Sequence, residues 1–247
     1  MEIQGGLSAN HNVLSHTLRC LPLKCSSMKP VISCFLILAL NLTSSASAAT
    51  SLLDEKPAGL PDISDFDELA IGRVGSIVHV SQNGSFLTVE ALQQGQHNVS
   101  LISQDGFNNS LDTIQKGEGN GQLVVQKGGE HDIGGYALSA DLYQEGTGNG
   151  LWLVQEGGGI SADISQFGEN NMAYAYQSGG GHWVDILQSG ADNFAYVNQE
   201  GFGHSASIEQ YGQGNVAVVV QYGENTTPAS VIQTGSEMSL QMLRYSR

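Results

Sequence analysis

A Gln-x-Gly triplet returns along this chain at almost every eleventh position, and this repeat constrains the fold more than any other feature of the sequence. The step is 18 between Gln126 and Gln144 and 12 before Gln233, and it is eleven elsewhere. A unit this short cannot bury an apolar face alone, so neighbouring units must stack on one another. The fourteen triplets begin at Gln82, Gln93, Gln104, Gln115, Gln126, Gln144, Gln155, Gln166, Gln177, Gln188, Gln199, Gln210, Gln221 and Gln233.

The residues between the triplets alternate in character with a period of two, which is typical of a β-strand. With each glutamine taken as position 0, positions −2 and −4 are mostly apolar, and Ser100 and Gln122 are the exceptions at −4. Asparagine often occupies position −6, at Asn98, Asn109, Asn120, Asn149, Asn171, Asn193 and Asn215. Glutamine, two apolar residues and asparagine therefore share one face of a short strand, and the glycine supplies the turn.

These patterns predict an all-β fold, a β-solenoid of 22-residue rungs in which each rung holds two strands from two 11-residue units. Rungs stack at about 4.8 Å, and fourteen units make about seven rungs. Each inward glutamine would lie above an identical residue, as would Asn149, Asn171, Asn193 and Asn215. Their amides would then form hydrogen-bonded ladders like those of an amyloid-like cross-β stack.

The precursor segment 1–49 has the pattern of a secretory signal. An apolar run, 31–42, follows Lys29 and precedes a stretch of small residues that contains Ala-x-Ala. We expect Met28 to be the true start and cleavage near residue 49, which removes all three cysteines. The remaining chain then divides into an acidic segment, 50–76, and the solenoid, 77–247, with a loop insertion at about 127–143.

The charge and the motifs exclude several functions. Asp and Glu number 24 against 9 Lys and Arg, a formal net charge of −15, so the chain lacks the basic clusters that a nucleic-acid binder needs. No nucleophile-elbow, zinc-protease or phosphate-loop motif occurs. We therefore expect no enzyme activity, metal site or cofactor. A carbohydrate-active β-helix enzyme is the remote alternative from another class.

The repeat resembles the curlin repeat of bacterial curli subunits. Gln-x-Gly-x-x-Asn followed by alternating small apolar residues occurs, for example, in the segments that begin at Gln166 and Gln210. This resemblance implies a secreted structural subunit of an extracellular functional amyloid fibre, a cell-surface pilus or fimbrium that serves biofilm and adhesion. It also implies other curlin subunits and the outer-membrane curli export machinery as partners. The resemblance leaves open whether the fibre also binds a ligand on a surface or on a host.

The degenerate carboxyl terminus is similar to that of the curlin nucleator, or minor subunit. Continuing the register from Gln233 brings Arg244 into the next glutamine slot, where a bulky cation would end the ladder. Arg244 and Arg247 are then candidates for anchoring the chain at the cell surface. A major fibre subunit with an ordinary solenoid cap is the alternative.

Three further sets of side chains have possible roles. One set recurs at every second triplet on the outward face and consists of Asp141, Asp163 and Asp185. These acids resemble the gatekeeper residues that slow stacking in curlin repeats. The alternatives are an ordinary solvated surface and a site for a shared divalent cation. His131, His182 and His204 occupy the asparagine slot, where they are satisfied inward side chains or a pH switch. Trp152 and Trp183 face outward and are candidates for adhesion.

Overall fold

The computed structural model describes residues 75–128 and 137–246, and there the chain consists of strands joined by tight turns. In this described part, no helix is long and apolar enough to span a membrane. The strands are β1 (Ile77–Ser85), β2 (Thr88–Gln96), β3 (Val99–Phe107), β4 (Asn109–Glu118), β5 (Gly121–Gly128), β6 (Leu138–Thr147), β7 (Gly150–Gly158), β8 (Ile160–Glu169), β9 (Met172–Gly180), β10 (Trp183–Ala191), β11 (Phe194–Phe202), β12 (Ser205–Gln213), β13 (Val216–Glu224), β14 (Ala229–Ser236) and β15 (Ser239–Tyr245).

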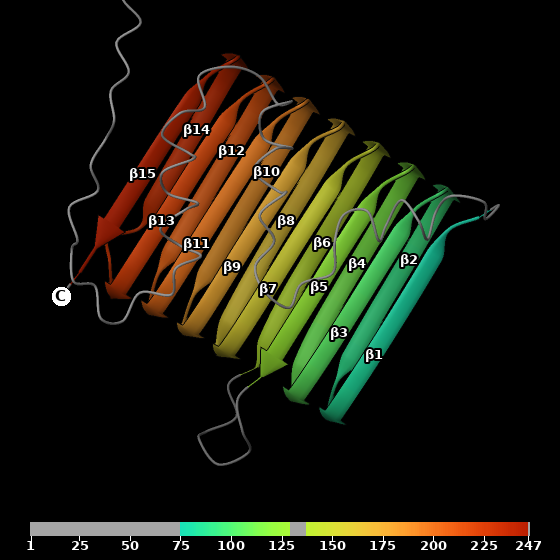
Figure 1. The fold of residues 1–247 in the computed structure, drawn as a ribbon, viewed down its shortest axis with the longest axis horizontal. Helices are drawn as coiled ribbons and strands as arrows, with labels where there is room; N and C mark the ends of the chain where they lie inside the picture. Colours follow the sequence, from blue (N-terminus) through green and yellow to red (C-terminus); the bar gives the residue numbers. More distant parts are fainter. Residues whose placement is uncertain (1–74, 129–136, 247) are drawn as a thin grey trace, which may run out of the picture.

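The strands form two parallel sheets that face each other (Figure 1). The odd-numbered strands make an eight-stranded sheet in the order β1 to β15, and the even-numbered strands make a seven-stranded sheet in the order β2 to β14. Each strand therefore pairs with the strand two places along the chain, and one odd and one even strand make one rung. The predicted β-solenoid of two-strand rungs, with about seven turns, is confirmed.

The register places glutamine opposite glutamine along each sheet, and it survives the irregular steps of the repeat. Gln115 lies opposite Gln144 and Gln126 opposite Gln155, although the insertion separates the members of each pair. Strand β5 runs to Gly128 and β6 begins at Leu138. The extra residues are thus accommodated between these two strands, and a single continuous stack runs through the insertion.

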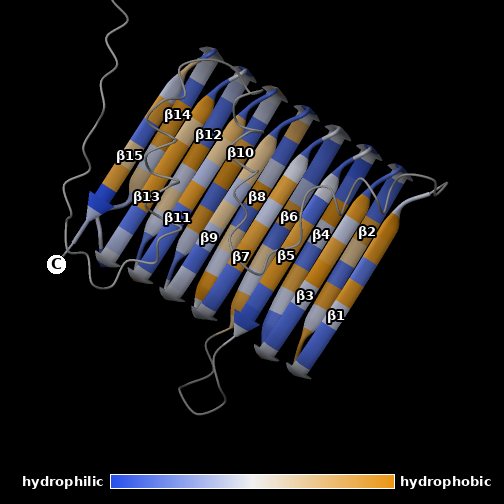
Figure 2. Cartoon of the chain, viewed as in Figure 1, coloured by the Kyte–Doolittle hydropathy of each residue, from blue (hydrophilic) through white to orange (hydrophobic). Residues whose placement is uncertain are grey.

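The core lies between the two sheets and consists of the residues at positions −2 and −4. Figure 2 shows hydrophobic bands that run across neighbouring strands, because in-register pairing aligns like residues. Ile164, Ile186 and Ile208, for example, lie in one column and are fully shielded from solvent. Burial of one such side chain contributes about 2 kcal/mol, so the column holds successive rungs together.

Most triplet glycines are required by both their backbone angle and their surroundings. Gly168 has φ of +109°, a region that side chains disfavour. A Cβ atom built there would lie 2.0 Å from the carbonyl oxygen of Gly190 in the next rung. Only glycine therefore allows the rungs to approach at the spacing of a β-sheet.

Candidate functional site

Two columns of glutamines run through the solenoid, one in each sheet, and all of them except the first in each column, Gln82 and Gln93, are buried. In each column the Nε2 amide donates a hydrogen bond to the Oε1 of the glutamine in the next rung, over 2.6 to 3.2 Å. The odd-strand column joins Gln82, Gln104, Gln126, Gln155, Gln177, Gln199 and Gln221. The even-strand column joins Gln93, Gln115, Gln144, Gln166, Gln188, Gln210 and Gln233.

In most of these glutamines the second amide hydrogen forms a bond to the facing sheet. Gln166 Nε2 also donates to the carbonyl oxygen of Gly150 in the facing sheet at 2.9 Å, and Gln188 does the same to Met172 at 3.0 Å. A buried amide left without partners costs about 1–3 kcal/mol. Any slip of register would leave several amides unpaired at once, so the columns select in-register stacking of like rungs.

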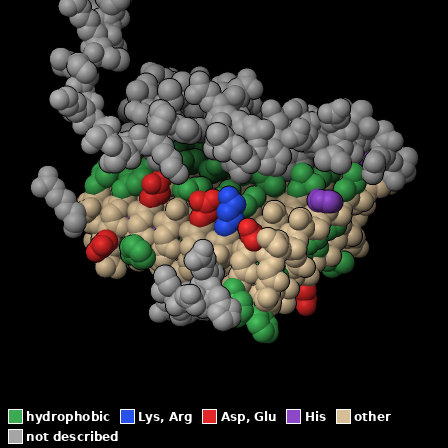
Figure 3. Space-filling model, turned by 60° about the horizontal axis from the view of Figure 1, so that its bottom comes forward, with side chains coloured by type: hydrophobic (Ala, Val, Ile, Leu, Met, Phe, Trp, Pro, Cys, Tyr) green, Lys and Arg blue, Asp and Glu red, His purple; other side chains and the backbone are tan. Residues whose placement is uncertain are grey.

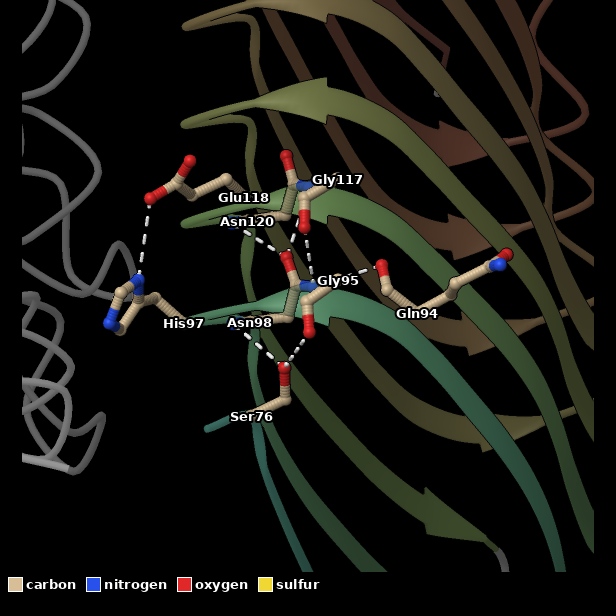
Figure 4. A network of polar contacts seen from close by, with 8 residues as sticks. All are labelled: Ser76, Gln94, Gly95, His97, Asn98, Gly117, Glu118 and Asn120. Atoms are coloured by element: carbon tan, nitrogen blue, oxygen red, sulfur yellow. Dashed lines mark hydrogen bonds and ion pairs between the residues drawn. The ribbon is translucent and has the colours of Figure 1, made fainter. Parts of the chain in front are cut away.

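Asparagines form a third column, at the edge where even strands turn into odd strands. It contains Asn149, Asn171, Asn193 and Asn215, and it extends back to Asn98 and Asn120. Figure 4 shows its first steps, in which the Asn98 Oδ1 accepts from both the backbone and the side-chain amide of Asn120. Ser76 Oγ accepts from the Asn98 backbone amide at 3.2 Å and so begins the column.

The opposite turn edge carries a mixed column in place of a ladder. Asn109 lies there beside Leu138, which offers no polar group, and the Asn109 Oδ1 is buried without a hydrogen-bond partner. Ile160 follows, and then His182 and His204, whose rings stack at 5.0 Å between centroids. His131 lies outside the described residues.

The two histidines are buried, and each is hydrogen-bonded through both ring nitrogens. The His182 Nδ1 accepts the backbone amide of His204 at 3.3 Å, which leaves its Nε2–H to donate to the Ser178 carbonyl oxygen at 3.1 Å. The His204 Nδ1 lies 2.9 Å from the Thr226 hydroxyl. Burial, and secondarily the neighbouring His204, lowers the pKa of His182.

A column of carboxylates lies on the outward face of the even-numbered sheet. Asp141, Asp163 and Asp185 stand opposite one another in successive strands, and the column continues to Asp112 and Glu90. Burial, and then repulsion from the adjacent carboxylates, raises the pKa of Asp163 and Asp185. No group of three or more His, Asp or Glu in the described ranges has the arrangement of a metal site.

Glu90 and Asp112 were missing from the sequence prediction because the insertion conceals their period. The insertion lies between Asp112 and Asp141, although both occupy position −3 relative to their glutamines. Counting from each glutamine, instead of along the chain, would have found them.

Three polar side chains in the core were also not anticipated as a group. Ser100 and Gln122, which interrupt the apolar position −4, lie in neighbouring odd strands, and Gln122 Nε2 donates to Ser100 Oγ at 2.6 Å. Thr113 of the facing sheet donates to the Gln122 Oε1 at 2.8 Å. All three are buried, and their mutual hydrogen bonds offset the loss of hydration.

The glutamine ladder ends differently at the two ends of the stack. At the β1 and β2 end, Gln82 and Gln93 donate to the next rung, and no rung precedes theirs among the described residues. At the other end Arg244 lies opposite Gln221, whose Nε2 donates instead to Thr226 Oγ1 at 2.9 Å. The guanidinium of Arg244 donates to Thr227 Oγ1. Arg247 lies outside the described residues.

The outer edges of the turns are weakly charged. In the view of Figure 3, a basic side chain lies beside acidic ones near the centre, and a few other acidic side chains are scattered over a mostly uncharged surface. One surface ion pair links Lys127 to Glu156 at 3.0 Å, and a second contact joins His97 to Glu118 at 3.4 Å, as drawn in Figure 4. Exposed pairs of this kind contribute little to stability, so backbone pairing and the buried columns dominate.

Comparison with known families supports a relationship to curlins. Residues 183–212 match the family model of the curlin associated repeat, and they cover β10, β11 and nearly all of β12. No curated protein sequence matches the chain significantly.

Proposed function

We propose that this chain is a secreted structural subunit of an extracellular curli-type amyloid fibre, and that it nucleates or anchors fibre polymerisation in biofilm and adhesion. The match to the curlin associated repeat supports self-assembly with other curlin subunits. The hydrophobic leader sequence is in keeping with export, for which the outer-membrane curli machinery would be the partner.

The observation that carries the proposal is that, in the part of the chain that the structure describes, each sheet ends on both sides in a strand with only one neighbour. Strands β1 and β2 lie at one end and β14 and β15 at the other, and an unpaired parallel edge is a template for another chain. Gln82 and Gln93 lie at the first edge, so an incoming rung with glutamines in the same slots would extend both ladders. The edge therefore favours a chain with the same repeat over an unrelated partner.

Arg244 favours a nucleating or anchoring subunit over a major subunit. A guanidinium group has no acceptor, so it cannot continue a ladder in which each amide must both donate and accept. Growth would then proceed from the β1 end, and the basic terminus would be available to a partner at the cell surface.

The test is deletion of residues 238–247, with retention at the cell surface as the measurement. We expect the truncated chain to form fibres in vitro but to be released from cells into the medium. As a matched control, the same segment is replaced by a copy of residues 215–224, which restores a half-rung with glutamine in the slot of Arg244. This replacement should also be released. Equal retention of the native, truncated and replaced chains would refute anchoring and favour a major subunit.

A further inference from the structure

Successive strands of the solenoid make the same contacts with the strand before them, whichever sheet they lie in. Gln93 of β2 donates to the Ile77 carbonyl oxygen of β1 at 3.0 Å, sixteen residues earlier in the chain. Gln104 of β3 donates to the Thr88 carbonyl oxygen of β2, also at 3.0 Å and sixteen residues earlier. The step from an odd to an even strand is therefore the same as the step from an even to an odd strand.

The two turn edges are equivalent in their backbone hydrogen bonds as well. At the edge where even strands turn into odd strands, the Val99 amide donates to the Asn120 carbonyl oxygen at 2.8 Å. At the opposite edge, the Ser161 amide donates to the His182 carbonyl oxygen at 2.9 Å. Both acceptors lie 21 residues after their donors (99 to 120 and 161 to 182). Each unit thus follows the previous one by a half-turn about the stack axis and an advance of half a rung.

The described part of the chain has an odd number of strands, fifteen. Strands β1 and β15 therefore lie in the same sheet, at its two ends (Figure 1). After β15, the next half-turn leads into the other sheet, to the open edge of β14. A following chain thus begins in the sheet that β1 does not belong to.

We propose that a second copy of this chain joins end to end after a half-turn about the stack axis, so that its odd-numbered strands continue the even-numbered sheet of the first copy. This proposal rests on the proposed function, since it assumes assembly through the open edges. In this rotated join, β1 of the second copy pairs with β14 and β2 pairs with β15.

An in-line join, with β1 against β15 and β2 against β14, leaves one sheet a strand short. Strand β15 advances the stack beyond β14, and β2 follows β1. When β1 pairs with β15, β2 therefore lies about 9.6 Å from β14 instead of the roughly 4.8 Å that pairing requires. Two strand edges would then face each other inside the fibre without hydrogen bonds, which is costly.

The last glutamine of the even-numbered column is placed for the rotated join. Gln233 donates to two backbone carbonyl oxygens at 3.1 Å each, as the interior Gln144 does at 3.1 and 3.2 Å. Gln144 also donates to the glutamine of the next rung at 2.8 Å. In the rotated join, Gln82 of the second copy supplies this acceptor to Gln233. The ladder then passes from the even-numbered column of one copy into the odd-numbered column of the next.

The half-turn alternates the two unlike outward faces along the fibre. At position −3 the even-numbered strands carry the carboxylate column, whereas three successive odd-numbered strands carry Trp152, Tyr174 and Tyr196 at this position. Each side of the fibre then carries the carboxylates of one copy followed by the aromatic side chains of the next. The repulsive columns of neighbouring copies therefore lie on opposite sides of the fibre.

Interchain disulfides distinguish the two joins. By the register of the glutamine slots, the rotated join places Ile232 opposite Ser81, and the in-line join places it opposite Leu92. All three side chains are exposed, and residues opposed on strands about 4.8 Å apart are within reach of a disulfide. Chain 50–247 has no cysteine of its own. A native acceptor chain therefore carries Ser81→Cys or Leu92→Cys, and the incoming chain carries Ile232→Cys.

The number of strands in the incoming chain should decide which cysteine it reaches under mild oxidation. We expect the native chain, and the chain in which residues 215–224 replace 238–247, to crosslink several-fold more to Ser81→Cys than to Leu92→Cys. The matched control is the chain truncated after residue 237, which lacks β15 and ends on β14. It should join in line and crosslink to Leu92→Cys instead.

Two adverse outcomes are distinguishable. If fifteen-strand chains crosslink to Leu92→Cys as strongly as to Ser81→Cys, the rotated join is wrong, while self-assembly stands. If no form assembles, the proposed function fails and this proposal fails with it.

The axial repeat of fibres made from one chain is an independent measurement without cysteines. In the rotated join, two copies complete one repeat with fifteen strands per sheet, so fibres of the replaced chain should repeat every 72 Å or so, at about 4.8 Å per strand. The truncated chain has seven strands per sheet and should repeat at about 34 Å. Electron cryomicroscopy measures both, and a repeat of about 38 Å for the replaced chain, eight spacings per copy, would overturn the proposal.

Discussion

At the scale of single residues, the triplet glycines allow neighbouring rungs to stack closely, because a larger side chain would clash with the next rung. This gives a first prediction. Gly168→Ala places a methyl group 2.0 Å from the Gly190 oxygen, so it should lower the free energy of unfolding by about 3 kcal/mol or more. Gly119→Ala is the matched control, since it has φ of +66° but nothing within 4 Å. This variant should lower the free energy of unfolding by only about 1 kcal/mol, because alanine is disfavoured in the left-handed backbone conformation. Thermal unfolding followed by circular dichroism measures both, and equal losses would show that close approach is unimportant.

The buried histidines give a prediction about pH. Because the folded chain lowers the pKa of His182, the unfolded chain binds a proton first as the pH falls. Stability is then complete above the ordinary histidine value of 6.5 and declines below it. H182N/H204N should abolish the decline of the unfolding temperature between about pH 7 and pH 5, because asparagine in this slot carries no titratable group. His97→Asn, which changes a half-exposed histidine outside the core, should retain it. A decline that survives in the double variant would assign the pH dependence to other groups.

At the scale of the strands, the carboxylate column opposes close stacking of the even-numbered sheet. Two carboxylates about 4.8 Å apart repel by roughly 1 kcal/mol in water. Replacing Asp141, Asp163 and Asp185 with Asn should therefore shorten the lag of fibre formation, measured with an amyloid dye. Asp163→Asn alone should shorten it more than Glu169→Gln, which removes the same charge from the end of β8, where the neighbouring strands place uncharged Thr147 and Ala191 opposite it. Lowering the pH toward the raised pKa of Asp163 and Asp185 should act in the same direction, because the folded column binds protons more readily. An unchanged lag in the triple variant would show that the carboxylate column is ordinary solvated surface with no effect on stacking.

The strands and their register were predictable because the alternation and the triplet each specify a local requirement. Every strand from β1 to β14 contains one triplet glutamine. Contacts between the facing sheets were harder to predict from the sequence, since no local pattern shows that Thr113 reaches Gln122 across the core. Alternation predicts the face on which a side chain lies, as it does for Trp152, but not which side chain it meets across the core.

At the scale of the whole molecule, the solenoid has a direction as well as two unlike faces. All strands are parallel, and every glutamine with a glutamine in the next rung donates to it in the carboxyl-terminal direction, so the two ends of the ladder are chemically different. The first end has glutamines whose Oε1 atoms can accept from an incoming amide, whereas Arg244 in the last odd strand cannot accept from Gln221, so the odd-strand ladder is interrupted before the β15 edge. A fibre that contains this chain should therefore grow from it in one direction.

Arg244→Gln tests this polarity. Glutamine at residue 244 could accept from Gln221 and donate onward, and so restore the ladder at the β15 edge. We expect single fibres seeded by the native chain to elongate from one end and those seeded by the variant to elongate from both, as followed by time-resolved fluorescence microscopy. Arg247→Gln removes the same charge outside the glutamine slot and should leave growth one-sided. If both variants grew from two ends, net charge would set the polarity. If neither did, a feature other than the broken ladder would block the β15 edge, since an unpaired strand with a matching amide column otherwise accepts the next chain.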